Sequence, residues 1–246
     1  MPAIDLIVIF LALFVGGAMK SATGVGLPII AIPVLTAYFN LQFAIAVSLI
    51  PTVLSNAWQV WKFRKEHTPR YLAVAILIGS CAGIALGVTL LASLPGRLLN
   101  LGVALVVVAF LISRFLKPDW RLSERMARLL AFPASISAGL VQGATGISAP
   151  VVLMFLSSVG LERGSFIFSV SLLFLVAGVA QVPAMIFAGL LGTDLIYGTV
   201  LTMIPVVAGL WFGEILSKYI SARLFDQLIV AFLVVLAIKL GWSAFF

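Results

Sequence analysis

Two nine-residue strings carry the residue types with the clearest potential for chemistry. Residues 20–28 read KSATGVGLP and residues 142–150 read QGATGISAP, so the same Ala, Thr, Gly and Pro recur at a constant spacing of 122 residues. Glycine permits positive φ and close backbone approach, and proline suits the first turn of a helix because the N–H it lacks would have no partner there. Each string therefore predicts a helix that stops and a second helix that starts, at Pro28 and at Pro150.

The starts of these second helices predict an anion site. Their expected cap residues, Leu27 and Ala149, have no side-chain oxygen, so the first-turn N–H groups need another acceptor, which deep in a bilayer must be protein, water or a ligand. Two such N-termini beside hydroxyl groups would bind an anion. The alternative is that the breaks serve close helix packing and that neighbouring carbonyls accept from the hydroxyls. The residues assigned to substrate binding are Lys20, Thr23, Gly24, Gly26, Gln142, Thr145, Gly146 and Ser148.

Lys20 indicates the sign of the substrate. An ammonium group within an apolar segment costs about 3 kcal/mol on insertion scales and is a functional candidate by default. No acidic residue lies near it in the sequence, so we expect an anionic substrate as its counter-ion. The alternatives are that Lys20 snorkels from a helix end or pairs with Glu214. The equivalent residue of the second string is Gln142, a neutral donor, so the predicted site is asymmetric.

A further pair of polar residues recurs at the same spacing, Gln59 and Gln181. Ser55 and Asn56 lie within one turn of Gln59, on a helix face that could line a pathway. The alternative is hydrogen bonding between helices, which is common for Asn and Gln in membranes. We interpret Ser55, Asn56, Gln59 and Gln181 as pathway-lining residues.

The composition is that of an all-α membrane protein. Hydrophobic residues make up 63% of the 246 residues and charged residues 9%, with a mean hydropathy of +1.26. The net charge of +7 comes from basic residues in short loops, the pattern of cytoplasmic loops rather than of a nucleic-acid partner. One Cys and one His allow neither a disulfide nor a Cys/His metal cluster within a protomer. We expect no cofactor, no metal and no enzymatic activity.

The strings divide the chain into two homologous repeats, 1–116 and 128–246, joined by a cytoplasmic loop at 117–127. Each repeat reads as a broken segment, with a short helix of about 11 residues that reaches roughly half a membrane, followed by three longer helices. The expected pieces are 4–22, 28–38, 41–61, 72–94 and 98–116, then 128–144, 150–160, 164–188, 195–217 and 224–243.

Two membrane topologies follow from the broken segments. If each is a re-entrant hairpin, the repeats are inverted, the basic loops all lie in the cytoplasm and both termini lie outside. If each crosses the membrane once, the repeats are parallel and three loop cations of the second repeat move outside. The positive-inside rule favours the inverted arrangement, and the parallel one stays open. The basic loops concerned are 62–70, 114–128, 161–163 and 218–223.

With these residues in view, the chain resembles the sulfite exporter TauE/SafE family of small, duplicated bacterial permeases. The resemblance covers essentially the whole chain, and its most specific part is the pair of strings at 20–28 and 142–150. It implies a multi-pass protein of the bacterial inner membrane that moves sulfite, related sulfur oxyanions or organosulfonates without a bound cofactor.

The sequence therefore predicts a secondary transporter for sulfite or a related small sulfur-containing anion. Its expected partners are that anion and the lipid bilayer, and a homodimer is compatible with the sequence. The alternatives are a passive anion channel, or a permease for an organosulfonate or thiosulfate. An integral-membrane enzyme is disfavoured because the apolar segments offer almost no acid, base or metal-binding groups.

Overall fold

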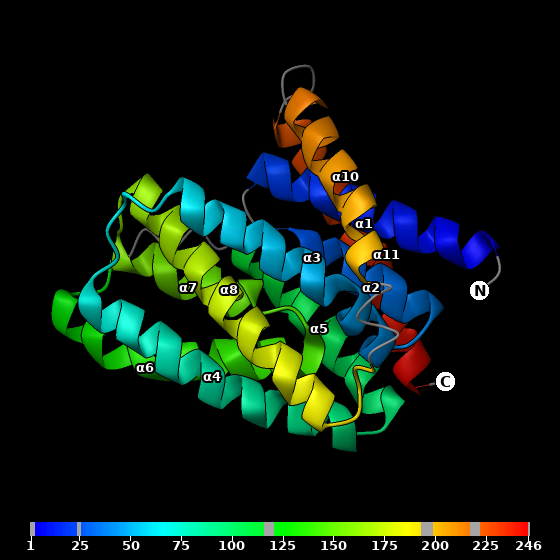
Figure 1. Ribbon diagram of the computed structural model, residues 1–246, viewed down its shortest axis with the longest axis horizontal. Coiled ribbons are helices and arrows are strands. Elements are labelled where there is room, and N and C mark those ends of the chain that lie inside the picture. Colours follow the sequence, from blue (N-terminus) through cyan, green and yellow to red (C-terminus); the bar gives the residue numbers. More distant parts are fainter. Residues whose placement is uncertain (1–2, 24–25, 116–120, 193–198, 217–221, 246) are drawn as a thin grey trace. The chain divides into compact units, whose positions relative to one another are not determined.

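The structure is a computed structural model that describes residues 3–23, 26–115, 121–192, 199–216 and 222–245 (Figure 1). Within these ranges the chain is all α-helical. Five stretches, Ala3–Ser21, Leu41–Lys62, Arg70–Ser93, Arg163–Phe187 and Thr199–Leu216, are long and apolar enough to cross a membrane. The helices are α1 (Ala3–Thr23), α2 (Leu27–Tyr38), α3 (Leu41–Lys62), α4 (Arg70–Ser93), α5 (Gly96–Phe115), α6 (Glu124–Thr145), α7 (Ala149–Val159), α8 (Arg163–Phe187), α10 (Met203–Leu216) and α11 (Ala222–Phe245).

The helices form two compact units. Unit 1 comprises Met1–Pro51, Leu94–Leu111 and Gly192–Phe246, and unit 2 comprises Thr52–Ser93 and Ile112–Leu191. Unit 1 therefore contains the first broken segment, α1 and α2, together with α10 and α11. Unit 2 contains the second broken segment, α6 and α7, with α4 and α8.

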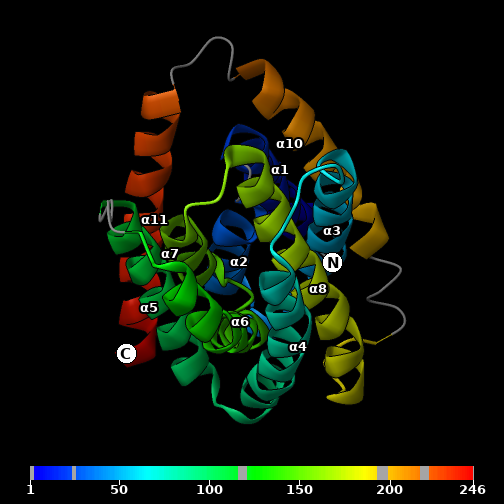
Figure 2. The same ribbon diagram turned by 90° about the vertical axis from the view of Figure 1, so that its left-hand side faces the viewer.

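Unit 2 is built on a close crossing of α4 and α6, which lie side by side in both ribbon views (Figures 1 and 2). A Cβ atom added at Gly83 of α4 would collide with the α6 backbone at Ile136 and Leu140, and one at Gly139 of α6 would collide with the α4 backbone at Ser80. Helices in lipid gain no hydrophobic energy from each other, so close contact through small residues is what holds them together. These glycines are packing residues.

Unit 1 has an equivalent crossing of α1 and α10. A Cβ atom at Gly17 would lie 2.6 Å from the carbonyl oxygen of Val206, and one at Gly209 would collide with the carbonyl of Phe14. The rings of Phe14 and Phe212 meet with centroids 5.4 Å apart beside this contact. The first helix of each broken segment is thus fixed by direct backbone contact with another helix of its unit.

Each broken segment folds back on itself. In unit 2 the backbone N–H of Leu122, just before α6, donates to the carbonyl of Ser158 near the end of α7 at 2.8 Å. In unit 1 the hydroxyl of Tyr38 at the end of α2 donates to Asp5 in the first turn of α1 at 3.4 Å. The short second helices therefore return to the end of the unit at which the first helices begin, so each pair is a hairpin.

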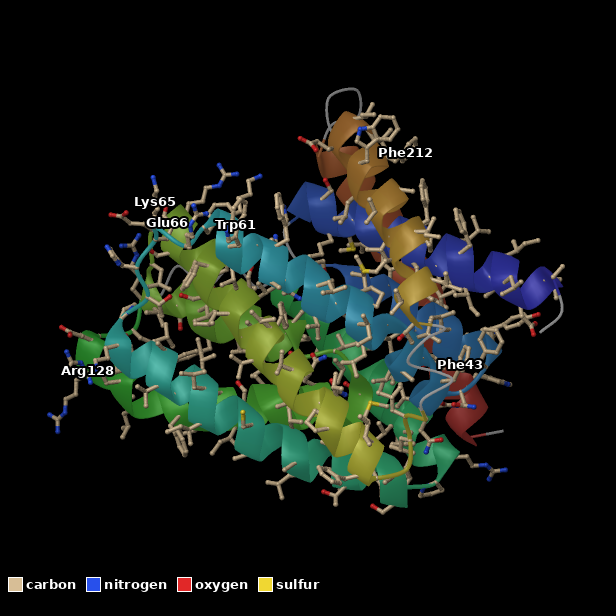
Figure 3. The ribbon with its side chains drawn as sticks, in the orientation of Figure 1. Phe43, Trp61, Lys65, Glu66, Arg128 and Phe212 are labelled. Atoms are coloured by element: carbon tan, nitrogen blue, oxygen red, sulfur yellow. The ribbon has the colours of Figure 1, made fainter. Side chains whose placement is uncertain are left out.

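Three loops meet at one end of unit 2. The hydroxyls of Thr68, before α4, and Ser169 of α8 lie 2.8 Å apart, and the Glu66 side chain packs against Gly164 at the start of α8. Together with the contact between the start of α6 and the end of α7, these interactions gather the loops before α4, α6 and α8. Figure 3 shows Lys65 and Glu66 in this region, beyond the end of α3.

The helix expected at 195–217 is described only as α10, Met203–Leu216, and its expected start lies outside the described residues. The other helix boundaries agree with the expected pieces to within a few residues. The largest of these differences is at α6, which begins at Glu124 and not at 128, because Ser123 caps it by accepting a hydrogen bond from the N–H of Met126 at 3.4 Å. Serine is a preferred N-cap and glutamate is favoured in the first turn. Because the residues of this turn are polar, the sequence had suggested that they belong to the connecting loop at 117–127.

The α4–α6 crossing makes Gly83→Ala a test of the fold. The new methyl group must push two helix backbones apart, so we expect a loss of about 1–3 kcal/mol of stability. Gly241→Ala is the matched control, because a Cβ at that helical glycine meets no atom within 4 Å. Unfolding of the two purified variants in the same detergent measures the difference. Equal stability of Gly83→Ala and the parent would contradict the backbone contact.

Candidate functional site

The break between α6 and α7 is stabilised by its own backbone and by one hydroxyl. Gly146 ends α6 with φ of 73°, a left-handed conformation that favours glycine, and its N–H donates to the carbonyl of Gln142 at 2.7 Å. The hydroxyl of Thr145 donates to the carbonyl of Val141 at 2.7 Å and accepts from the N–H of Ile147 at 3.3 Å. The Thr145 hydroxyl is thus hydrogen-bonded to neighbouring backbone in this structure, and its role in substrate binding stays a prediction.

The second helix starts one residue earlier than expected. Ser148, and not Ala149, is the N-cap of α7, with Pro150 in the first turn, but the Ser148 side chain makes no capping hydrogen bond. In unit 1 the N-cap of α2 is Gly26, and not Leu27, with Pro28 in the first turn. The cap assignment was wrong by one residue in both cases. The expected need of the first-turn N–H groups for another acceptor still holds, because neither N-cap residue caps its helix with a side chain.

The hydroxyl of Ser148 is used elsewhere. It donates to the Gln142 side-chain carbonyl, Oε1, at 2.9 Å. Gln142 in turn meets Gln181 of α8: Nε2 of Gln142 lies 3.5 Å from Oε1 of Gln181, and Nε2 of Gln181 donates to the Gln142 backbone carbonyl at 3.3 Å. All three side chains are buried. We call Gln142, Ser148 and Gln181 the glutamine cluster.

The glutamine cluster contains residues from two predicted groups, the substrate-binding residues and the pathway-lining residues. Gln142 and Ser148 were expected in the substrate site and Gln181 along the pathway, and all three converge on the helix break. Amide and hydroxyl groups supply hydrogen-bond donors without net charge. An oxyanion placed here would meet neutral donors beside the uncapped N-terminus of α7.

The polar residues of α3 form a second group. Ser55 Oγ and Asn56 Nδ2 donate to the carbonyl of Thr52, at 3.1 and 2.7 Å. Ser171 of α8 donates to Oε1 of Gln59 at 3.4 Å. This group thus binds α3 internally and links it to α8, as expected for hydrogen bonding between helices. Its role in lining a pathway stays a prediction.

In unit 1 the first string places Lys20 in the last turn of α1, with only 4% of the residue exposed. A snorkelling lysine would carry its ammonium group to the surface, so this burial favours a position in the protein interior. A Cβ at Gly26 would lie 2.7 Å from the Met19 side chain, so glycine is needed there for space. Thr23 is the last residue of α1, and its side chain, like the whole of Gly24, lies outside the described residues.

Two serines belong with these groups and were missed by sequence reasoning. Ser171 supplies the partner of Gln59, and Ser80 of α4 is fully buried with a hydroxyl that has no hydrogen-bond partner in the described part of the chain. Single serines in apolar helices give no distinctive local signal. The recurrence of glutamine at positions 59 and 181 indicated that α3 and α8 carry functional polar residues. It did not indicate which side chains would hydrogen-bond to these glutamines.

The comparison with protein families decides the identity. The model for the sulfite exporter TauE/SafE family matches residues 9–240, nearly the whole chain. The chain belongs to this family. No curated protein and no solved structure matches it significantly. The resemblance noted from the two strings is confirmed, and with the apolar helices it identifies a multi-pass membrane protein of a family that transports sulfur anions.

The glutamine cluster predicts an energetic coupling between α6 and α8. We expect Gln142→Met and Gln181→Met to interact in a double-mutant cycle by about 0.5–1.5 kcal/mol, the range of side-chain hydrogen bonds between membrane helices. Unfolding by a denaturing detergent gives the four stabilities. As a control, Gln181→Met with Thr89→Val should be additive, because among the described residues Thr89 bonds only to carbonyls of its own helix, Ala85 and Leu86. A coupling near zero for the glutamines would contradict the cluster.

Proposed function

We propose that this member of the TauE/SafE family is a secondary transporter that moves sulfite, or a related small sulfur-containing anion, across the bacterial inner membrane. The observation that carries the proposal is a buried polar cluster at a helix break, in a chain whose family transports sulfur anions. A polar group inside an apolar bundle is costly and marks a candidate pathway. Broken helices are where many secondary transporters bind substrate.

The chemistry of the glutamine cluster supports an oxyanion as its ligand. The start of α7 has no side-chain cap, so the positive end of its dipole is open to an anion. The hydroxyl of Ser148 can turn from Gln142 Oε1 to a substrate oxygen, which exchanges one hydrogen bond for another. Neutral donors bind an anion without holding it as tightly as a buried ion pair would, and a transporter must release its substrate.

We propose that the first string supplies the charge. Lys20, with Thr23, Gly24 and Gly26, would bind the same anion as Gln142, Thr145, Gly146 and Ser148. The burial of Lys20 supports this role, because an ammonium group is retained in an apolar segment where it interacts with a functional partner. The proposed site is then asymmetric, because the first string contributes a charged side chain and the second string contributes neutral ones.

We also propose that the two repeats are inverted. The hairpin contacts from Leu122 to Ser158 and from Tyr38 to Asp5 support re-entrant segments, because both ends of each segment then lie on one side of the membrane. The glycine contacts support duplication. Gly139 on Ser80 and Gly17 on Val206 are equivalent pairs, since each joins the first helix of a hairpin to the fourth expected segment of the other repeat.

Transport by variants of Lys20 tests the proposed function. In proteoliposomes we expect saturable sulfite flux that Lys20→Met lowers tenfold or more, since a lost interaction of about 1.4 kcal/mol is tenfold in affinity. Lys20→Arg should be intermediate, because it keeps the charge but changes the donor geometry. Gln142→Met should be milder, because it removes no net charge.

The controls separate the alternatives. Each variant must insert and purify like the parent, so that lost flux is not lost folding. Parental flux and affinity in Lys20→Met would exclude contact between the ammonium group and substrate. Flux that does not saturate and does not respond to a proton gradient would favour a passive channel. Saturable flux of an organosulfonate or thiosulfate, without flux of sulfite, would show that the substrate is that anion and not sulfite.

Cysteine labelling tests the inverted arrangement. In a Cys81→Ala background, we expect an impermeant thiol reagent to label Ala3→Cys and Phe246→Cys from the outside only. Lys65→Cys and Arg121→Cys, in two of the basic loops, should be labelled only from the cytoplasm. Cytoplasmic labelling of both Ala3→Cys and Phe246→Cys would instead favour parallel repeats.

A further inference from the structure

A groove opens at the end of unit 2 where the loops gather. Its volume is about 950 Å³, and its walls come from the starts of α4 and α6 and from the end of α7. Every residue that lines it belongs to unit 2. Along α6 it extends from Glu124 to Phe132. The glutamine cluster lies at the last turn of this helix, at Gln142, and the 10 residues from Phe132 to Gln142 correspond to roughly 15 Å. The groove is therefore distinct from the candidate substrate site.

The lining of the groove is divided by polarity. Arg70 and Arg128 lie at its loop end, and Figure 3 labels Arg128 near the start of α6. The guanidinium carbon of Arg128 lies 5.4 Å from the ring centroid of Tyr71, which also lines the groove. Further along the helices the walls are apolar, with Val74 and Phe132 45% and 43% exposed.

The charge at the loop end is positive despite one acidic residue. Glu124 lines the groove and pairs with Arg128 at 2.6 Å, which leaves Arg70 as the uncompensated lining charge. Arg121 adds a second cation beside the groove, because its side chain packs over Gly160 just after α7. The starts of α4 and α6 contribute the positive ends of two helix dipoles. An anion is the complementary ligand.

We propose that this groove binds an anionic phospholipid, with its phosphate between Arg70 and Arg128 and an acyl chain along Val74 and Phe132. A soluble anion would match the arginines but would leave the apolar walls without a partner. A neutral lipid would match the walls but not the charge. Since lipid chains are as apolar as the walls, the head group supplies the selectivity, as in other basic pockets between membrane helices.

Lipid binding to the purified full-length protein tests the proposal. We would measure binding by native mass spectrometry and by thermal stability in detergent, adding phosphatidylglycerol or phosphatidylcholine with identical acyl chains. We expect phosphatidylglycerol to bind about tenfold more tightly and to raise the unfolding temperature, since each nearby cation strengthens binding to an anionic lipid. The double variant Arg70→Gln/Arg128→Gln should lose this preference.

Two further variants keep the test decisive. Val74→Trp fills the apolar part of the groove without changing charge, and it should weaken phosphatidylglycerol binding even if the arginine variant fails to fold. Arg97→Gln removes an exposed arginine at the start of α5, outside the groove, and should keep the full preference. An equal loss in Arg97→Gln would overturn the proposal in favour of non-specific charge attraction.

A competitor separates the sources of phosphate. Glycerol 3-phosphate carries a phosphate group but no acyl chain, so it should not displace phosphatidylglycerol at equal concentration. Equal competition would indicate a site for a soluble anion and would overturn the proposal. So would equal binding of the two lipids. None of these outcomes depends on sulfite transport, so the lipid proposal and the transport proposal fail independently.

Discussion

The constraint on which this structure depends is that a helix cannot stop inside a bilayer without partners for its free backbone groups. Each unsatisfied N–H or carbonyl costs several kcal/mol in hydrocarbon. In unit 2, Gly146 and the hydroxyl of Thr145 bind the groups freed at the end of α6, whereas the start of α7 has no side-chain cap. The end of α6 is thus stabilised by local residues. This division is why we propose the start of α7, and not the end of α6, as the place for a ligand.

A hairpin of this kind also needs support from outside itself. α2 and α7, with 12 and 11 residues, reach only about 16–18 Å and cannot span a bilayer alone. Their partners α1 and α6 are fixed by glycine contacts to α10 and α4, where backbone meets backbone. Such contacts leave little freedom to slide, because a shift would bring side chains against the opposite backbone. The first helix of each hairpin is therefore held in place by another helix of its own unit.

Much of this arrangement follows from local sequence, and the missing part is long-range. The Gly and Pro spacing predicted where α1, α2, α6 and α7 end or begin, because those residues act on their own backbone. It could not show that Ser148 turns from its helix to Gln142, or that Gln181 would reach the same atoms from α8, since both depend on which helices become neighbours. The polar turn at Glu124 was assigned to a loop because charge outweighed the Ser123 cap. Whether the two strings share one site depends on the arrangement of the two units, which no local pattern fixes.

If Lys20 and Gln142 bind the same anion, as we propose, the difference in their charge explains how the protein both attracts and releases it. Two buried lysines would repel each other when empty and hold a divalent oxyanion too tightly when occupied, because charge pairs strengthen as the dielectric constant falls. One ammonium group and one amide keep the attraction while limiting the cost of the empty state. The bond from Ser148 to Gln142 supports the same balance, since it gives the neutral donors an internal partner when substrate leaves. In the proposed site, substrate binding would exchange hydrogen bonds instead of creating them from unsatisfied groups. The two strings, which share the glycine break but contain only one lysine, have the composition that this balance requires.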